Sequence, residues 1–128
     1  MRLSTTVNFL LPPYNQSLQS GIDALRRYRA LGFSSLDSIF CGAAAPDSFF
    51  RDQDWEMRIH GLADAANEIG ITFVQSHIPT PNPYLTPASA MDDTNAMIHR
   101  SISAASILGA PWTVGHPFTA LGHPTPML

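Results

Sequence analysis

Three glycines divide the chain at nearly equal intervals, and each lies between two apolar residues. They occur in Leu31-Gly32-Phe33, Ile69-Gly70-Ile71 and Leu108-Gly109-Ala110, so that successive glycines are 38 and 39 positions apart. A glycine just past the last helical turn readily adopts the left-handed conformation that ends many helices. The apolar residues that follow are typical of a buried strand. The pattern therefore predicts a repeating unit of strand, loop, helix and glycine.

Apolar residues recur at spacings of three and four before each glycine, which places each set on one face of a helix. The sets are Ile22, Leu25 and Tyr28; Trp55, Ile59, Leu62, Ala66 and Ile69; and Ile98, Ile102 and Ala105. Residues suited to cap the helix starts are Ser20, Asp52 or Asp54, and Asp92 or Asp93. Three helices are therefore expected.

Four strands are expected between these helices, over residues 3–9, 35–40, 71–77 and 111–116. The resulting order, β-α-β-α-β-α-β, predicts an α/β fold with parallel strands covered by helices and joined by right-handed crossovers. A solenoid is the alternative, although solenoid repeats usually share a consensus and only the glycine recurs here. The longest loops follow the strands rather than precede them. Since parallel α/β proteins build their sites at the carboxyl ends of the strands, we expect function there.

Composition excludes several classes of function. A chain of 128 residues, 45% of them hydrophobic, suits one domain. The net charge of −3 gives no positive field for a nucleic acid partner, and all seven basic residues are arginines, which excludes a Schiff-base lysine. Cys41 is the single cysteine, and no apolar run suits a signal peptide or a membrane helix. We therefore expect a soluble, cytoplasmic protein with no membrane partner.

Two histidines follow the third and fourth expected strands, His77 in Gln75-Ser76-His77-Ile78-Pro79 and His116 in Val114-Gly115-His116-Pro117. Adjacent parallel strands lie about 4.8 Å apart, so the two imidazoles could share one metal ion or one substrate. Neutral imidazoles suit zinc, manganese or iron. The alternative is that each ring packs at a strand end and bonds a nearby carbonyl.

Three further polar residues lie in or near the expected strands. Asp37 interrupts an apolar strand, and a buried carboxylate costs several kcal/mol unless it is paired, so Asp37 either faces the open end of the sheet or has a partner such as an arginine. Asn8 could bind a polyol or satisfy loop backbone. Cys41 precedes a run of small residues with no evident base, which favours an inert thiol.

Five short segments, taken in order, carry a resemblance to a known family. They are Asn8-Phe9, Leu31-Gly32-Phe33, Asp54-Trp55, Gln75-Ser76-His77-Ile78-Pro79 and Trp112-Thr113-Val114-Gly115-His116-Pro117. Together they resemble the sugar phosphate isomerase/epimerase family, which has the xylose isomerase-like TIM barrel also found in the endonuclease IV type of abasic-site nuclease. A complete barrel takes about 250 residues. The resemblance therefore implies an incomplete (β/α)8 TIM barrel, a half barrel over residues 1–117, followed by a proline-rich tail without regular structure at residues 118–128.

The activity implied by this resemblance is metal-assisted proton transfer next to a sugar carbonyl, in an aldose-ketose isomerisation or an epimerisation. It implies a divalent metal (Mn, Zn or Mg) bound by His77 and His116, and a sugar or sugar phosphate bound by Asn8, Asp37, His77 and His116. The main catalytic carboxylates of the family come from strands five to eight, so we expect a truncated chain with little activity alone. A non-catalytic α/β binding or assembly module of the same fold is the alternative. An abasic-site nuclease would need a basic surface, which the composition does not provide.

A half barrel would expose two sheet edges and an apolar inner face. A two-fold homodimer, in which the fourth strand of each chain pairs with the first strand of the other, would cover them. We therefore expect a homodimer or a larger assembly.

Overall fold

The computed structural model describes residues 3–81 and 86–116. Strands and helices alternate along the chain as expected. They are β1 (Ser4–Val7), α1 (Leu18–Ala30), β2 (Ser35–Ile39), the short 3-10 helix η1 (Phe49–Arg51), α2 (Trp55–Ile69), β3 (Thr72–His77), α3 (Ala88–Ile107) and β4 (Thr113–Val114). Each strand is shorter than expected, and β4 has only two residues. The expected tail at residues 118–128 lies outside the described residues.

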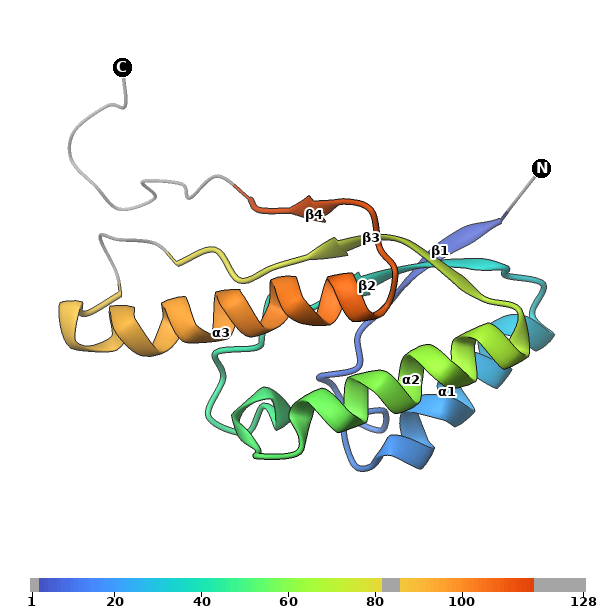
Figure 1. Ribbon diagram of the computed structural model, residues 1–128, viewed down its shortest axis with the longest axis horizontal. Helices are drawn as coiled ribbons and strands as arrows, with labels where there is room; N and C mark the ends of the chain where they lie inside the picture. Colours follow the sequence, from blue (N-terminus) through green and yellow to red (C-terminus); the bar gives the residue numbers. More distant parts are fainter. Residues whose placement is uncertain (1–2, 82–85, 117–128) are drawn as a thin grey trace, which may run out of the picture.

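The four strands form one parallel sheet in the order β1-β2-β3-β4. When each strand is placed beside the previous one in the same direction, right-handed crossovers put every connecting helix on the same side of the sheet. Accordingly, α1, α2 and α3 all lie against one face (Figure 1). The predicted α/β fold with parallel strands is therefore confirmed. Within the described ranges the strand order never reverses, unlike the order in a doubly wound sheet.

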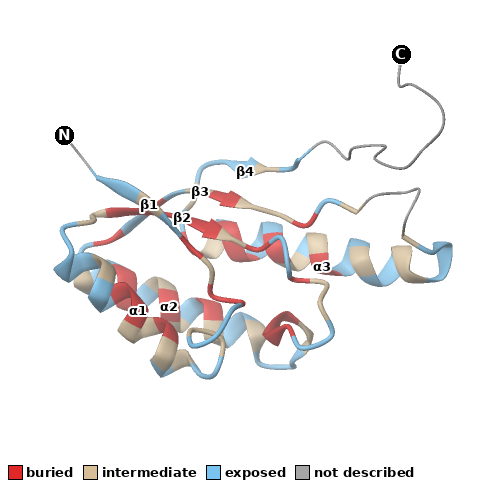
Figure 2. Cartoon of the chain, turned by 180° about the vertical axis from the view of Figure 1, so that it is seen from behind, coloured by how far each residue is buried: buried red, intermediate tan, exposed pale blue. Residues whose placement is uncertain are grey.

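The core fills the space between the sheet and the helices, and Figure 2 shows the buried residues on the strands and on the helix surfaces that face them. Its fully buried members come from every layer: Phe9, Leu25, Leu36, Phe40, Phe50, Ile59 and Leu62. Along β2, Leu36 and Ser38 face the helices, so the alternation of side chains directs Asp37 to the opposite face.

A β-bulge in β3 changes which side chains face the helices. Leu36 of β2 lies opposite Phe73, but the next residue, Asp37, lies opposite Gln75, so Val74 is the extra residue. Before the bulge Phe73 packs in the core, and after it Ser76 is fully buried instead. A bulge commonly re-aims side chains in this way. It places Gln75 on the same face as Asp37.

The sheet face opposite the helices is largely polar, and the expectation of an apolar inner face is therefore wrong. Thr6, Asp37 and Gln75 are register partners across three strands, and His77 follows two residues later on this face. The physical reason is that regular alternation in β1 and β2, combined with the bulge in β3, directs the polar positions of all three strands to the same side. We call this surface the open face.

The helix ends agree with the glycine pattern. Gly32, Gly70 and Gly109 have φ angles of 95°, 79° and 74°, the left-handed region that L side chains rarely adopt. The prediction that Ser20 is the N-cap of α1 is wrong, because the helix begins about one turn earlier. Ser17 caps α1 and exchanges hydrogen bonds with Ser20 in a capping box.

The N-cap prediction is correct for α2 and wrong for α3. Asp54 occupies the N-cap position of α2, as expected, although its side chain makes no capping hydrogen bond. The expected cap at Asp92 or Asp93 is wrong, because α3 begins after Pro87 and both aspartates lie inside the helix. No helix of the described residues has the length and apolarity needed to cross a membrane.

Candidate functional site

His77 and His116 lie side by side at the carboxyl ends of β3 and β4. His77 is the last residue of β3 and pairs with Val114, two residues before His116. The imidazole rings stack with centroids 4.9 Å apart and planes inclined by 23°. Nδ1 of His77 lies 2.9 Å from Nε2 of His116, within hydrogen-bonding distance. The backbone N–H of His116 donates to Oγ1 of Thr80 at 2.9 Å, which ties the end of β4 to the loop after β3.

Asp37 lies behind His77 and is only 7% exposed. Its Oδ2 accepts a hydrogen bond from Nε2 of Gln75 at 2.7 Å and lies 3.0 Å from Nε2 of His77. The two nitrogens are 3.5 Å apart because they share this one acceptor. Of the two possibilities that the sequence left for Asp37, the structure shows a paired carboxylate, but the partners are a histidine and a glutamine rather than an arginine.

With both rings neutral, one pair of tautomers satisfies this hydrogen-bond chain. A carboxylate only accepts, so Nε2 of His77 carries the proton that Asp37 accepts. In the neutral His77 ring, Nδ1 is then the basic nitrogen, and it accepts from Nε2–H of His116. A carboxylate placed behind an imidazole in this way orients the ring and raises its basicity toward a metal ion.

The other oxygen of the Asp37 carboxylate, Oδ1, is buried and accepts no hydrogen bond from the described part of the chain. A buried polar atom without a partner carries a desolvation cost of about 1–3 kcal/mol. Such atoms are frequent where a site stores strain or binds a water or an ion. The hydroxyl oxygens of Ser38 and Ser76 are buried without a described partner in the same way, so this feature is not specific to the cluster.

Cys41 lies in the same cluster, so two imidazoles are near it in space although no base is near it in the sequence. One ligand atom each from Cys41, His77 and His116 lies within 4.8 Å of the others. Desolvation by the surrounding protein raises the pKa of the Cys41 thiol, and the negative charge of Asp37 raises it further. In the absence of a bound cation the sulfur is therefore a thiol at neutral pH. The sequence signal for this neighbourhood was the position of Cys41 directly after the expected strand at residues 35–40, at the same sheet edge as both histidines.

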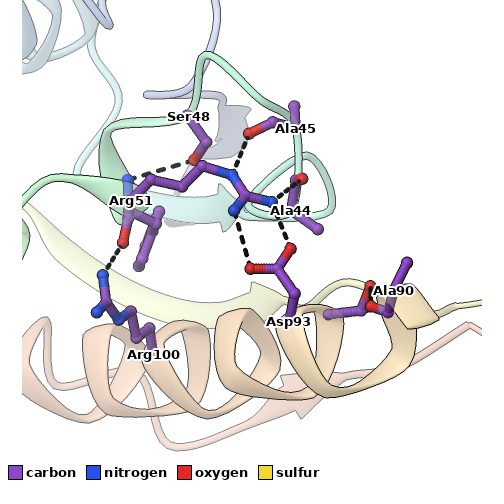
Figure 3. Close-up of polar contacts among 9 residues, drawn as sticks. Ala44, Ala45, Ser48, Arg51, Ala90, Asp93 and Arg100 are labelled. Carbon is purple, nitrogen blue, oxygen red and sulfur yellow. Dashed lines mark hydrogen bonds and ion pairs between the residues drawn. The ribbon is translucent and has the colours of Figure 1, made fainter.

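The loop that carries Cys41 is fastened to α3 by Arg51 (Figure 3). The Arg51 guanidinium donates to the carbonyl oxygens of Ala45 and Ala44 at 2.9 and 2.6 Å. It also forms a bidentate pair with Asp93 at 2.9 and 2.7 Å. This pairing lowers the pKa of Asp93 and raises that of Arg51, mainly through the hydrogen bonds between them. The aspartate expected to cap α3 therefore anchors this loop instead.

Asn8 has a local role in the described structure. Its side-chain Oδ1 accepts a hydrogen bond from the backbone N–H of Leu10 at 3.0 Å. This contact stabilises the turn after β1, which is the loop-backbone role that the sequence left open. It does not involve the Asp37, His77 and His116 cluster.

Three side chains that are potential ligands of a divalent metal ion come together in this cluster. Two imidazole nitrogens and one sulfur converge, and a carboxylate supports one of the rings. Three protein ligands with a further position left for water or substrate is the usual arrangement in catalytic zinc sites. The comparison with such sites rests on the types of these donors and on their mutual distances.

Comparison of the chain with family models, with curated proteins and with solved structures gave no significant match. The resemblance to the sugar phosphate isomerase/epimerase family therefore stays a prediction.

Proposed function

We propose that this chain supplies half of a metal-dependent sugar isomerase or epimerase site. The observation that carries the proposal is the hydrogen-bonded chain from Asp37 through His77 to His116, with separations of 3.0 and 2.9 Å. A carboxylate behind one of two adjacent imidazoles is the arrangement by which proteins orient histidine ligands toward a metal ion. The substrate is a sugar or a sugar phosphate, and the reaction moves a proton between carbons next to a carbonyl.

His77 and His116 would hold the ion, which when bound supplies Lewis-acid polarisation of a substrate carbonyl or hydroxyl oxygen. Asp37 keeps the proton on Nε2 of His77, so that Nδ1 stays available as a donor to the ion. Gln75 holds the Asp37 carboxylate in place at 2.7 Å. Thr6, which is exposed on the open face, presents a hydroxyl that suits hydrogen bonding to a sugar.

The architecture in this proposal is half of a (β/α)8 barrel. The sequential strand order, the helices on one face and the imidazoles at the carboxyl edge support it. Proton transfer between carbons also needs a base. The described contacts of Asp37, with Gln75 and His77 through one oxygen, give it the role of holding His77 instead. We propose that a second half barrel, contributed by a second copy of the chain, supplies the remaining groups, and that the protein acts in the cytoplasm.

The proposal is tested by assaying aldoses and aldose phosphates for isomerisation with added Mn²⁺, Zn²⁺ or Mg²⁺. His77→Ala and His116→Ala are expected to abolish turnover, whereas His99→Ala, at an exposed position of α3, keeps it. Circular dichroism checks that each variant remains folded. Turnover that persists in both site variants rejects the assignment. A protein that binds metal through these histidines without turnover is instead the non-catalytic binding module.

A further inference from the structure

We propose that the sulfur of Cys41 is a third ligand of this centre, so that the site takes zinc or another thiophilic divalent ion in preference to manganese or magnesium. The inference rests on the metal-dependent function proposed above and specifies its donor set. It starts from the cluster formed by Cys41, His77 and His116, whose ligand atoms all lie within 4.8 Å of one another.

The distances in this cluster suit a tetrahedral ion. Zinc lies about 2.3 Å from a thiolate and about 2.0–2.1 Å from an imidazole nitrogen, which puts neighbouring ligand atoms roughly 3.3–3.6 Å apart. Nδ1 of His77 and Nε2 of His116 are 2.9 Å apart, and one ligand atom of each of the three residues lies within 4.8 Å of the others. Binding of an ion therefore requires these side chains to adjust and the hydrogen bond between the rings to break.

The backbone holds Cys41 in place before any ion binds. The N–H of Phe40 donates to the carbonyl oxygen of His77 at 2.8 Å, which extends the pairing of β2 with β3 up to the residue before Cys41. Ala43 then closes a turn onto Phe40 at 2.9 Å. Beyond the turn, Arg51 clamps the loop to Asp93. The sulfur therefore lies on a segment fixed at both sides, beside the ring that Asp37 orients.

The proton balance of binding is simple. The Cys41 thiol loses its proton to solvent as the sulfur–metal bond forms, since only the thiolate is a ligand. His116 frees its Nε2 by carrying its ring proton on Nδ1 instead, while His77 keeps its proton on the Nε2 that faces Asp37. One proton is released for each ion bound, and no oxidant or reductant takes part.

The chemistry of the sulfur sets the choice of metal. Thiolate ligands favour zinc and other borderline or soft ions, whereas magnesium and manganese prefer carboxylate, carbonyl and water oxygens. With three protein ligands, a tetrahedral ion keeps one position for water or substrate. The inference therefore specifies a zinc-type centre with an open position on a polar sheet face.

Cobalt(II) provides a spectroscopic test, because a cobalt–thiolate bond gives a charge-transfer absorption in the near ultraviolet that nitrogen and oxygen ligands do not give. Cys41 is the single cysteine of the chain, so the band can arise from no other residue. We expect wild-type protein titrated with Co²⁺ to show it, and Cys41→Ser to lose it. We expect the same variant to bind zinc more weakly by at least the roughly 10–100-fold that loss of an outer-shell partner costs. Manganese affinity is expected to stay unchanged, and His99→Ala serves as the control.

The outcomes separate this inference from the proposed function. Cobalt that binds through His77 and His116 without the charge-transfer band, together with equal zinc affinity in Cys41→Ser, overturns the role of the sulfur and leaves the histidine site standing. Failure of the wild-type protein to bind Co²⁺, Zn²⁺ or Mn²⁺ overturns both. Isothermal titration with each ion alone measures the affinities, and circular dichroism confirms that the variants are folded.

Discussion

Replacing Phe50 with alanine tests whether packing holds the loop that carries Cys41. Phe50 lies in η1 and is fully buried. Its ring centroid lies 5.0 Å from that of Phe40, edge to face, and 5.0 Å from that of Phe49, stacked. It also stacks on Trp55 at 5.6 Å. The side chain therefore joins the end of β2, the loop and the start of α2.

The expected loss follows from these contacts. Truncation of a buried phenylalanine to alanine costs about 3–5 kcal/mol, because transfer and cavity terms add. Each aromatic pair contributes about 0.5–1.5 kcal/mol beyond the buried area. With three such pairs, Phe50→Ala is expected near the upper end of that range. Since whole domains are stable by about 5–15 kcal/mol, this one change removes roughly a third or more of the folding free energy.

Urea unfolding followed by circular dichroism measures the change. Tryptophan fluorescence gives a second readout, because Trp55 stacks directly on Phe50. Met57→Ala is the matched control, since Met57 also lies on α2 but is 67% exposed, and the expected change is within about 0.5 kcal/mol. A loss below about 1.5 kcal/mol for Phe50→Ala would refute the packing described for this loop.

Three further predictions concern the glycine cap, the loop clamp and the assembly. Gly70→Ala is expected to lower the free energy of unfolding by about 1–2 kcal/mol in urea, because φ is 79° at this position. Gly42→Ala is the control, since Gly42 has no positive φ and the nearest atom to an added Cβ is 3.9 Å away. Equal losses in the two variants would show that the positive φ is not the cause. The lowered pKa of Asp93 means that its pairing with Arg51 stabilises the fold above the ordinary carboxyl pKa of 3.8 and that this contribution is lost as the pH falls below it. Asp93→Asn is therefore expected to be less stable than wild type at pH 7, with a gap that closes in acid; a gap that is constant with pH would show that the charge plays no part. Light scattering is expected to give twice the 13.9 kDa chain mass, whereas a monodisperse monomer would rule out pairing of the sheet edges between two copies.

The order of the elements was predictable because it depends on local signals. The glycines at 32, 70 and 109 end helices through their own backbone conformation, and the apolar spacing before them is set by the helix period. These signals act over a few residues and do not depend on the rest of the fold. The helix starts were less predictable, since Ser17 and Ser20 are both good capping residues and their roles are decided by a shift of one turn.

The makeup of the candidate site depended on long-range features that short sequence patterns do not contain. Regular alternation would have put Gln75 and His77 on the same face as Phe73, and only the bulge at Val74 directs them to the open face. A bulge depends on how two strands pair, so the sequence of one strand does not reveal it. The imidazoles beside Cys41 were not predictable for the same reason, because they are distant in sequence and are brought together by the strand ends.

Stabilisation of the folded chain by zinc is the measurement that shows whether the two histidines bind a metal ion. A ligand that binds only the native state at about 100 times its dissociation constant adds roughly 2.7 kcal/mol to the free energy of unfolding. We expect a gain of this kind for the untagged wild-type protein and for His99→Ala, and its loss in the double variant His77→Ala/His116→Ala. An unfolding free energy that does not respond to zinc in the wild-type protein, or that rises equally in the double variant, would contradict the proposed centre.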